Sequence, residues 1–253
     1  MGFKAASKPP NADSILLKIM QYENNEKQGV PMIKDAVDRI LNRPKKYKTE
    51  MVSADEAGLA RAAALLTSGE NVAIPTETVY GLAVDPFSET ALDRLYEVKG
   101  RPSAMPVLLV VADRGMVEMV VKEISEKARR CMEIFWPGPL SLLLPARSDL
   151  PKRVIGPEGK VCVRCSSHYI ARGLSRLMGR PITSTSANLT GSPPARTARE
   201  AALQGVDLIL DGTCGTAAVP STVFDPDTGK IVREGPITEA MLYVVCHGNG
   251  LHY

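Results

Sequence analysis

Residues 71–82 read Asn71-Val72-Ala73-Ile74-Pro75-Thr76-Glu77-Thr78-Val79-Tyr80-Gly81-Leu82 and join an apolar run to a polar cluster. The apolar run, residues 71–75, predicts a short buried strand. Upstream, residues 53–56 have the spacing of a capping box, which predicts a helix running to about Ser68 and closed by Gly69. A helix that leads directly into a buried strand is typical of an α/β protein.

The same alternation continues along the rest of the chain. Further helices are expected after Ser88, after Asp113, at 126–135 and at 168–178, and further strands at 107–111, 140–144, 161–164, 181–184, 208–210, 222–225 and 230–233. Several late strands are joined by short turns, such as Pro-Asp-Thr-Gly within residues 225–229. Short turns favour antiparallel neighbours, so we expect an α/β fold with a mixed sheet and flanking helices.

Composition and charge exclude some classes of protein. The chain has 253 residues, of which 44% are hydrophobic and 23% charged, as in ordinary globular proteins. The net charge of +3 is unevenly distributed. Residues 1–52 hold 10 Lys and Arg against 6 Asp and Glu, a net of +4, and residues 53–253 hold 21 against 22, a net of −1. A protein that coats nucleic acid by bulk charge is usually basic throughout.

The sequence also predicts a compartment. No apolar run approaches the roughly 20 residues that span a bilayer, and residues 1–14 contain no apolar segment typical of a secretory signal. Acidic residues such as Asp13 and Glu23 argue against a transit peptide. The five cysteines are an odd number without the spacing of a small disulfide-bonded domain. We therefore expect a cytoplasmic protein that does not bind membranes.

Three parts are expected along the chain. Residues 1–52 predict a helical N-terminal extension that ends in a basic linker, Arg43–Lys48. Two amphipathic helices there could pack on the body or on a second subunit, and the linker lysines could instead contact RNA phosphates. Residues 53–242 predict the main domain. Residues 243–253, with Cys246, His247 and His252, are expected to form a frayed, flexible tail.

Four segments carry more polar side chains than packing requires. They are Pro75–Leu82, Lys99–Pro102, Thr183–Asn188, and Pro220–Thr222 together with Arg233–Gly235. All four lie at the ends of predicted elements, and ligands of open α/β sheets bind beyond the carboxyl ends of strands. Each segment alone could be an ordinary turn or helix end, but together they predict an anion-binding cleft.

Several standard sites are absent from the sequence. It contains no P-loop motif and no G-x-G-x-x-G after a strand. None of the three histidines lies in the four polar segments, which disfavours a Ser-His-Asp or Cys-His mechanism. Cys162 and Cys165 have C-x-x-C spacing, but on a strand residues three apart point to opposite faces. We therefore predict no metal site formed by protein side chains.

The four segments, in this order, resemble the YrdC-type threonylcarbamoyl-AMP synthase family, and the resemblance covers about residues 55–240. It rests on PTETVYGL (75–82), KGRP (99–102), FWPGPL (135–140), Val163-Arg164, SANLTG (186–191), STV (221–223) and Arg233. The resemblance implies a twisted mixed sheet with a large, concave, positively charged face. It does not extend to residues 1–52.

The resemblance also implies an activity. Members condense L-threonine, bicarbonate and ATP, with magnesium, into threonylcarbamoyl-adenylate and pyrophosphate, and partner proteins transfer the threonylcarbamoyl group to adenosine in tRNA. Attack of a carboxylated amine on the α-phosphate needs positioning and cationic stabilisation, and it needs no side-chain nucleophile. This chemistry agrees with the absence of a nucleophile motif.

By position in these motifs, the resemblance implies roles for nine residues. Lys99 and Arg101 correspond to catalytic cations that face the reacting phosphates or carbamate. The nucleotide-contacting residues would be Arg101, Ser186, Asn188 and Arg233. The threonine-contacting residues would be Thr78, Arg164, Ser184 and Ser221, with Arg164 suited to the amino acid's carboxylate.

The sequence departs from the family pattern at a few positions. Val110 stands where many members carry a histidine near the threonine, Lys160 replaces a small hydroxyl residue, Ser166 replaces a proline and Pro194 replaces a serine. Val110 and Pro194 motivate an alternative, a relative that binds nucleotide or RNA without turnover. A third possibility, a carbamoyl-transfer domain as in hydrogenase-maturation proteins, is disfavoured because those chains are much longer and carry zinc-finger-like cysteine clusters.

Overall fold

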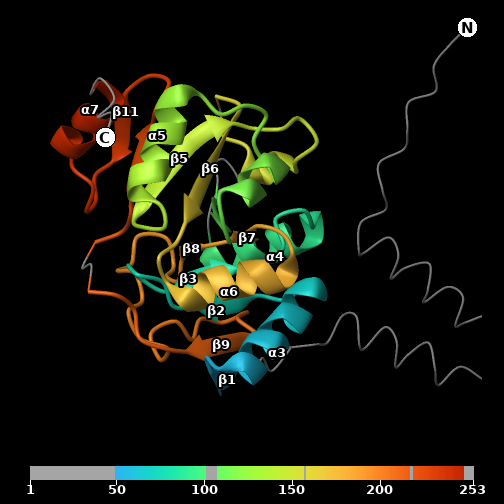
Figure 1. Ribbon diagram of the computed structural model, residues 1–253. Coiled ribbons are helices and arrows are strands. Elements are labelled where there is room, and N and C mark those ends of the chain that lie inside the picture. Colours follow the sequence, from blue (N-terminus) through green and yellow to red (C-terminus); the bar gives the residue numbers. More distant parts are fainter. Residues whose placement is uncertain (1–48, 101–106, 157, 217–218, 248–253) are drawn as a thin grey trace, which may run out of the picture. The chain divides into compact units, whose positions relative to one another are not determined.

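The strands of this chain form two mixed sheets, as Figure 1 shows. The structure, a computed structural model, describes residues 49–100, 107–156, 158–216 and 219–247. The first sheet has the order β1-β9-β2-β3-β8 and the second β11-β10-β5-β6-β4-β7. The strands are β1 (Glu50–Ser53), β2 (Val72–Ile74), β3 (Gly81–Ala83), β4 (Leu108–Val111), β5 (Leu140–Pro145), β6 (Lys160–Cys165), β7 (Ile182–Thr183), β8 (Thr185–Ser186), β9 (Leu208–Asp211), β10 (Thr222–Asp225) and β11 (Lys230–Arg233).

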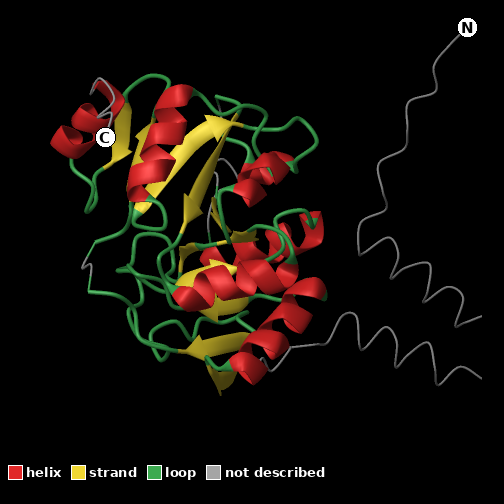
Figure 2. Cartoon of the chain, in the orientation of Figure 1, coloured by secondary structure: helices red, strands yellow, loops and turns green. Residues whose placement is uncertain are grey.

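Helices flank both sheets (Figure 2). They are α3 (Glu56–Thr67), α4 (Glu89–Lys99), α5 (Glu126–Phe135), α6 (Tyr169–Met178) and α7 (Glu239–His247), with short 3-10 turns at Gly115–Met119 and Lys152–Val154. Side chains of Asp55, Ser88 and Ser125 accept hydrogen bonds at the starts of α3, α4 and α5, as N-caps do. Within the described residues, no helix has the length and apolar character that a membrane crossing requires.

The two sheets meet at Ser184. Strand β7 is the last strand of the second sheet and β8 the last strand of the first, and Ser184 is the single residue between them. On the neighbouring strand, an alanine at Gly81 would place its Cβ 2.3 Å from Ser184 Oγ. A glycine is therefore required where β3 passes this junction.

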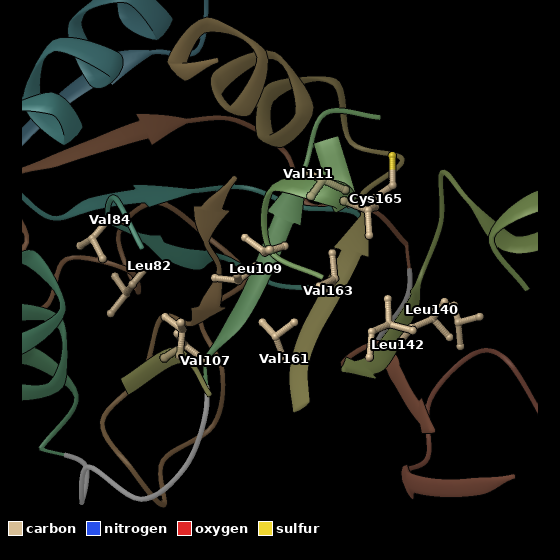
Figure 3. Packing of buried hydrophobic residues seen from close by; sticks show 14 of the residues in the cluster. Leu82, Val84, Val107, Leu109, Val111, Leu140, Leu142, Val161, Val163 and Cys165 are labelled. Carbon is tan, nitrogen blue, oxygen red and sulfur yellow. The ribbon is translucent and has the colours of Figure 1, made fainter. Parts of the chain in front are cut away.

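Alternation along β6 separates the core from a cavity. Val161, Val163 and Cys165 belong to the main hydrophobic cluster, next to core side chains of β4 and β5 such as Leu109 and Leu142 (Figure 3). The intervening residues Lys160, Cys162 and Arg164 line a cavity on the other face. Period-two alternation of a strand produces this division. It also places Cys162 and Cys165 on opposite faces, as predicted.

The element pattern agrees with the predicted α/β class, but the strands differ from the prediction in three ways. Strands β3 and β8, which lie within the polar segments, were not predicted. A strand of two or three residues has too little periodicity to be recognised in a sequence. The predicted mixed sheet is two mixed sheets. Strand β1 was also not predicted. It pairs in parallel with β9, so the body begins before residue 53.

The C-terminal boundary differs as well. Residues 243–247 were expected in a flexible tail, but they belong to α7. Leu242 and Cys246 of α7 are buried, and Cys246 Sγ lies 3.8 Å from Cys131 Sγ of α5. Burial of these two side chains holds the helix in place. Residues 1–48 of the predicted extension, and His252, lie outside the described residues.

Candidate active site

A cavity of about 780 Å³ lies between the two sheets' junction and the outer face of β6. Side chains from both sheets line it, together with the end of α4 and the loop after β8. Every predicted site residue except Arg101 lines this cavity, namely Thr78, Lys99, Arg164, Ser184, Ser186, Asn188, Ser221 and Arg233. Arg101 lies outside the described residues. Residues spread over more than 150 positions of sequence therefore meet in one place.

Lys99 is the first of three cationic side chains on the cavity wall that the sequence predicted. It is the last residue of α4, and Gly100, in the left-handed region with φ of 55°, ends the helix. Lys99 Nζ donates hydrogen bonds to Ser186 O at 2.5 Å and to Asn188 Oδ1 at 2.9 Å. Ser186 Oγ donates to the same amide oxygen at 2.6 Å. Only 4% of Lys99 is exposed, so its ammonium group is held at a fixed point on the cavity wall.

A second cation, Arg233, is held by Ser221. Arg233 Nε donates to Ser221 O and Arg233 Nη2 to Ser221 Oγ, both at 3.0 Å. Ser221 Oγ also lies 2.8 Å from Ser141 Oγ of β5. These contacts tie the end of β11 to the residue before β10. They orient the guanidinium group beside the cavity.

The third cation, Arg164, is the residue that the family resemblance assigns to the amino acid's carboxylate. It is 2% exposed, and its Nη1 donates to Thr78 Oγ1 at 3.4 Å. Thr78 Oγ1 is 3.0 Å from Thr76 Oγ1, which also donates to Val79 O at 2.7 Å. Thr76 and Thr78 therefore belong to a tight turn in which the Thr78 hydroxyl contacts the arginine.

Sequence reasoning missed the ion pair between Lys160 and Asp225. Lys160 Nζ lies 2.7 Å from both carboxylate oxygens of Asp225 and 3.2 Å from Asp227 Oδ2. Burial alone would raise the pKa of Asp225, but hydrogen bonds from Lys160 and from the Asp227 N–H hold that pKa below its ordinary value. Burial alone would lower the pKa of Lys160, but its bonds to the two aspartates raise it. The sequence signals Lys160 only as a departure from the family pattern, because its partner Asp225 is 65 positions away.

The other departures lie in different places. Val110 is fully buried in the second hydrophobic cluster, among residues of β2, β9, α3 and α6. Neither Val110 nor Pro194 lines the cavity. Ser166 lies beside Glu77, to which its hydroxyl donates a hydrogen bond. Among these four positions, only Lys160 contributes a side chain to the cavity wall.

The cavity has no activated nucleophile among its described residues. Burial raises the pKa of Cys162 to about 11, so its thiol stays protonated at neutral pH. In the described part of the chain, no three His, Cys, Asp or Glu side chains come together to hold a metal ion. Asp225, the buried carboxylate on the cavity wall, is already engaged by Lys160. The wall therefore offers cations, hydroxyls and amides, which suit an anionic ligand.

Comparison with known proteins identifies the family. A family model described as "Telomere recombination", covering Sua5, YciO and YrdC proteins, matches residues 64–235. This chain belongs to the Sua5/YciO/YrdC family. Its sequence-based recognition as a YrdC-type protein is confirmed.

Two named members of this family are similar to this chain in sequence. The threonylcarbamoyl-AMP synthase of Bacillus subtilis is 39% identical over 203 residues, which are 78% of this chain and 59% of that protein. The threonylcarbamoyl-AMP synthase of Klebsiella pneumoniae is 36% identical over 181 residues, 70% of this chain and 95% of that protein. The chain thus spans about three fifths of the longer relative and nearly all of the shorter one.

A solved structure of a family member resembles this one. The crystal structure of Pyrococcus abyssi Sua5 complexed with L-threonine matches with a TM-score of 0.72 and 34% identity. The match covers 79% of this chain and 60% of that chain. The predicted fold class is confirmed.

Proposed function

We propose that this protein is an L-threonylcarbamoyladenylate synthase, a nucleotidyltransferase. It condenses L-threonine, bicarbonate and ATP into threonylcarbamoyl-AMP and releases pyrophosphate. The observation that carries the proposal is the meeting of Lys99, Arg164 and Arg233 around one cavity whose wall has no activated nucleophile among the described residues. The names of the Bacillus and Klebsiella relatives support it.

The reaction needs two bond-forming steps. The amino group of threonine adds to the carbon of bicarbonate, and water leaves, so that a carbamate forms. A carbamate oxygen then attacks the α-phosphorus of ATP, and the bond from that phosphorus to the bridging oxygen of the β-phosphate breaks. Negative charge grows on the α-phosphate oxygens and on the departing pyrophosphate, so fixed cations stabilise the transition state.

Each cation is assigned to one part of the reactants. Lys99, held by Ser186 O and Asn188 Oδ1, faces the reacting phosphates, and Ser186, Asn188 and Arg233 contact the nucleotide. Arg101 is proposed to add a second catalytic cation, although it lies outside the described residues. Because Lys99 is already fixed by its neighbours, little reorganisation is needed when charge develops.

Threonine is proposed to bind on the opposite side of the cavity. Arg164 pairs with its carboxylate, because a guanidinium matches a carboxylate in a two-pronged geometry. Thr78, Ser184 and Ser221 supply hydroxyls for its amino and hydroxyl groups. The Pyrococcus structure complexed with L-threonine supports this amino acid as the ligand class.

We propose that magnesium binds to the site as a complex with the phosphates of ATP. The described cavity wall offers no cluster of carboxylates for it, and Asp225 is occupied by Lys160. When bound, the ion neutralises phosphate charge. The chain's own residues orient the nucleotide around it.

The wider setting is proposed from the same reaction. Threonylcarbamoyl-AMP is a reactive mixed anhydride, so it is passed to proteins that transfer the threonylcarbamoyl group to tRNA. Direct binding of tRNA to this chain is a separate part of the proposal. A cytoplasmic location agrees with five cysteines that form no disulfide.

One assay tests the activity. Pyrophosphate release from ATP should require both bicarbonate and threonine, and radiolabelled bicarbonate should enter an adenylate. Equal rates with serine or without an amino acid would contradict the substrate assignment. Tight tRNA binding with a steep salt dependence and no pyrophosphate release would favour the non-catalytic alternative. That alternative no longer has support from Val110, which lies in the core.

The site assignment has its own variants. Lys99→Ala should lower pyrophosphate release at least tenfold, because one fixed cation near the phosphates is lost. Lys127→Ala is the matched control, since Lys127 is an exposed lysine of α5 that does not line the cavity. Wild-type activity in Lys99→Ala would contradict the assignment of this cation.

A further inference from the structure

Arg164 faces the cavity, but the carboxylate nearest to it does not. Arg164 lines the cavity wall, whereas its ionic partner Glu77 is not among the lining residues. Arg164 Nε lies 3.8 Å from Glu77 Oε1. Glu77 therefore supplies negative charge to Arg164 from outside the space that a ligand would occupy.

This pairing leaves part of the guanidinium without a hydrogen bond. A separation of 3.8 Å is too long for a hydrogen bond, and the buried Nε of Arg164 has no partner within the described residues. The contact from Nη1 to Thr78 Oγ1 is also long, at 3.4 Å. A buried charged group with unmatched donors is unfavourable unless a ligand completes its bonds.

Glu77 itself is firmly held. Its Oε2 accepts a hydrogen bond from the Ser166 hydroxyl, and its Oε1 accepts one from the Ser167 N–H at 3.4 Å. Ser166 Oγ in turn accepts from the His168 N–H at 3.2 Å, where α6 begins. The Ser166 hydroxyl therefore ties Glu77 Oε2 to the turn between β6 and α6, and the longer contact from the Ser167 N–H lies on the same side, so the carboxylate cannot move toward the cavity without losing its bond to Ser166.

We propose that Glu77, clamped by the Ser166 hydroxyl, is a positioning residue that holds Arg164 so that its guanidinium group donates hydrogen bonds to the α-carboxylate of the amino-acid substrate. Glu77 does not touch the substrate. Because its oxygens are engaged elsewhere, it neutralises Arg164 enough to keep the guanidinium buried and leaves hydrogen-bond donors for the ligand. The identity of the ligand rests on the proposed function.

The decisive variants change geometry and keep charge. Glu77→Asp retains the negative charge but is one methylene shorter, and Ser166→Ala removes one clamp. We expect the dissociation constant for threonine, measured by calorimetry, to rise about tenfold in Glu77→Asp and severalfold in Ser166→Ala. The dissociation constant for threoninamide, which lacks the carboxylate, should stay within twofold of wild type in both variants.

Two controls separate positioning from general damage. Ser167→Ala removes a neighbouring exposed hydroxyl but keeps the N–H that contacts Glu77, so it should bind threonine as wild type does. The dissociation constant for ATP without amino acid should be unchanged in every variant. If circular dichroism shows that Glu77→Asp does not fold, the milder Ser166→Ala decides.

The outcomes also separate this inference from the proposed function. Threonine binding within twofold of wild type in the decisive variants overturns the inference alone. Equal weakening of threonine and threoninamide overturns it too, because the effect would not pass through the carboxylate. Tighter threonine binding in Glu77→Gln would mean that Glu77 only competes for the charge of Arg164. A wild-type protein that binds ATP but no threonine overturns the amino-acid assignment, and this inference with it.

Discussion

At the scale of a single residue, Gly81 shows how closely the two sheets approach each other at the site. It lies on β3, opposite Ile74 on one side and Ser186 on the other. Its neighbour Ser184 lines the cavity and connects the sheets. The absence of a side chain at position 81 therefore determines where the Ser184 hydroxyl can lie.

Gly81→Ala should damage both stability and binding. The new Cβ would lie 2.3 Å from Ser184 Oγ and 3.3 Å from Ser184 Cβ, so Ser184 must move. We expect a loss of about 1–3 kcal/mol in the free energy of unfolding, as for overpacked cores, together with weaker threonine binding. Urea denaturation and calorimetry measure the two effects.

Gly173→Ala is the matched control. Gly173 lies within α6, and its added Cβ would come no closer than 3.7 Å to Leu59 Cδ1. Alanine also favours a helix over glycine by up to about 1 kcal/mol, so stability should stay level or rise. Equal losses in both variants would show that the contact with Ser184 is not the cause.

At the scale of an element, α7 illustrates how weak the sequence signal of a short terminal helix is. Its exposed side includes Tyr243 and Val244, and it is attached chiefly through Leu242 and Cys246. We expect Leu242→Ala to lower the free energy of unfolding by about 2–4 kcal/mol. Val244→Ala, at a position 67% exposed, should change it by less than about 0.5 kcal/mol. Urea denaturation curves that coincide for the two variants would contradict the docking of α7.

The Lys160–Asp225 pair connects the start of β6 to the end of β10. Because the pKa of Asp225 is lowered by folding, its contribution to stability is present above the ordinary carboxyl pKa of about 4 and is lost as pH falls below it. The pKa of Lys160 is raised, so its contribution is present below about pH 10 and is lost at higher pH.

The effect of Asp225→Asn on the free energy of unfolding should therefore depend on pH. At pH 7 we expect it to lower the free energy of unfolding by up to about 3 kcal/mol, because Lys160 loses the closer of its two carboxylate partners. The difference between wild type and variant should shrink as the pH falls from 5 to 2, when measured by urea denaturation at each pH. A difference that stays constant over that range would show that ionisation of Asp225 contributes nothing.

At the scale of the whole molecule, the boundary of the body lies earlier than the charge pattern indicated. Residues 47–253 form one compact unit. Within it, Thr49 Oγ1 donates to Val206 O, and Glu50–Ser53 pairs with β9. The sequence-based boundary at residue 53 would cut away a strand of the first sheet.

Two deletions test this boundary. Removal of residues 1–46 should leave pyrophosphate release within about twofold of the full chain, because the cavity and both sheets are kept. Removal of residues 1–53 should lower the melting temperature by several degrees, since β9 loses its parallel partner. Loss of activity in a folded chain lacking residues 1–46 would show that this segment contributes to the site.

The sequence alone determined the class of fold, most of the long elements and the family. Strongly periodic segments such as α5 at Glu126–Phe135 were predicted with their bounds, and ordered motifs identified the site residues that line the cavity. These signals are local, because capping, periodicity and turn chemistry depend on residues close in sequence.

Only the tertiary structure decided what lies beside what. It showed that the expected mixed sheet is two sheets joined at Ser184, and that α7 packs on the body through buried side chains. It also placed Glu77 beside Arg164, on the side away from the cavity. It also placed Lys160 against Asp225 and Val110 in the core. Such contacts join residues far apart in the sequence, for example Cys131 and Cys246, which are 115 positions apart. They depend on the packing of whole elements, which no local pattern specifies.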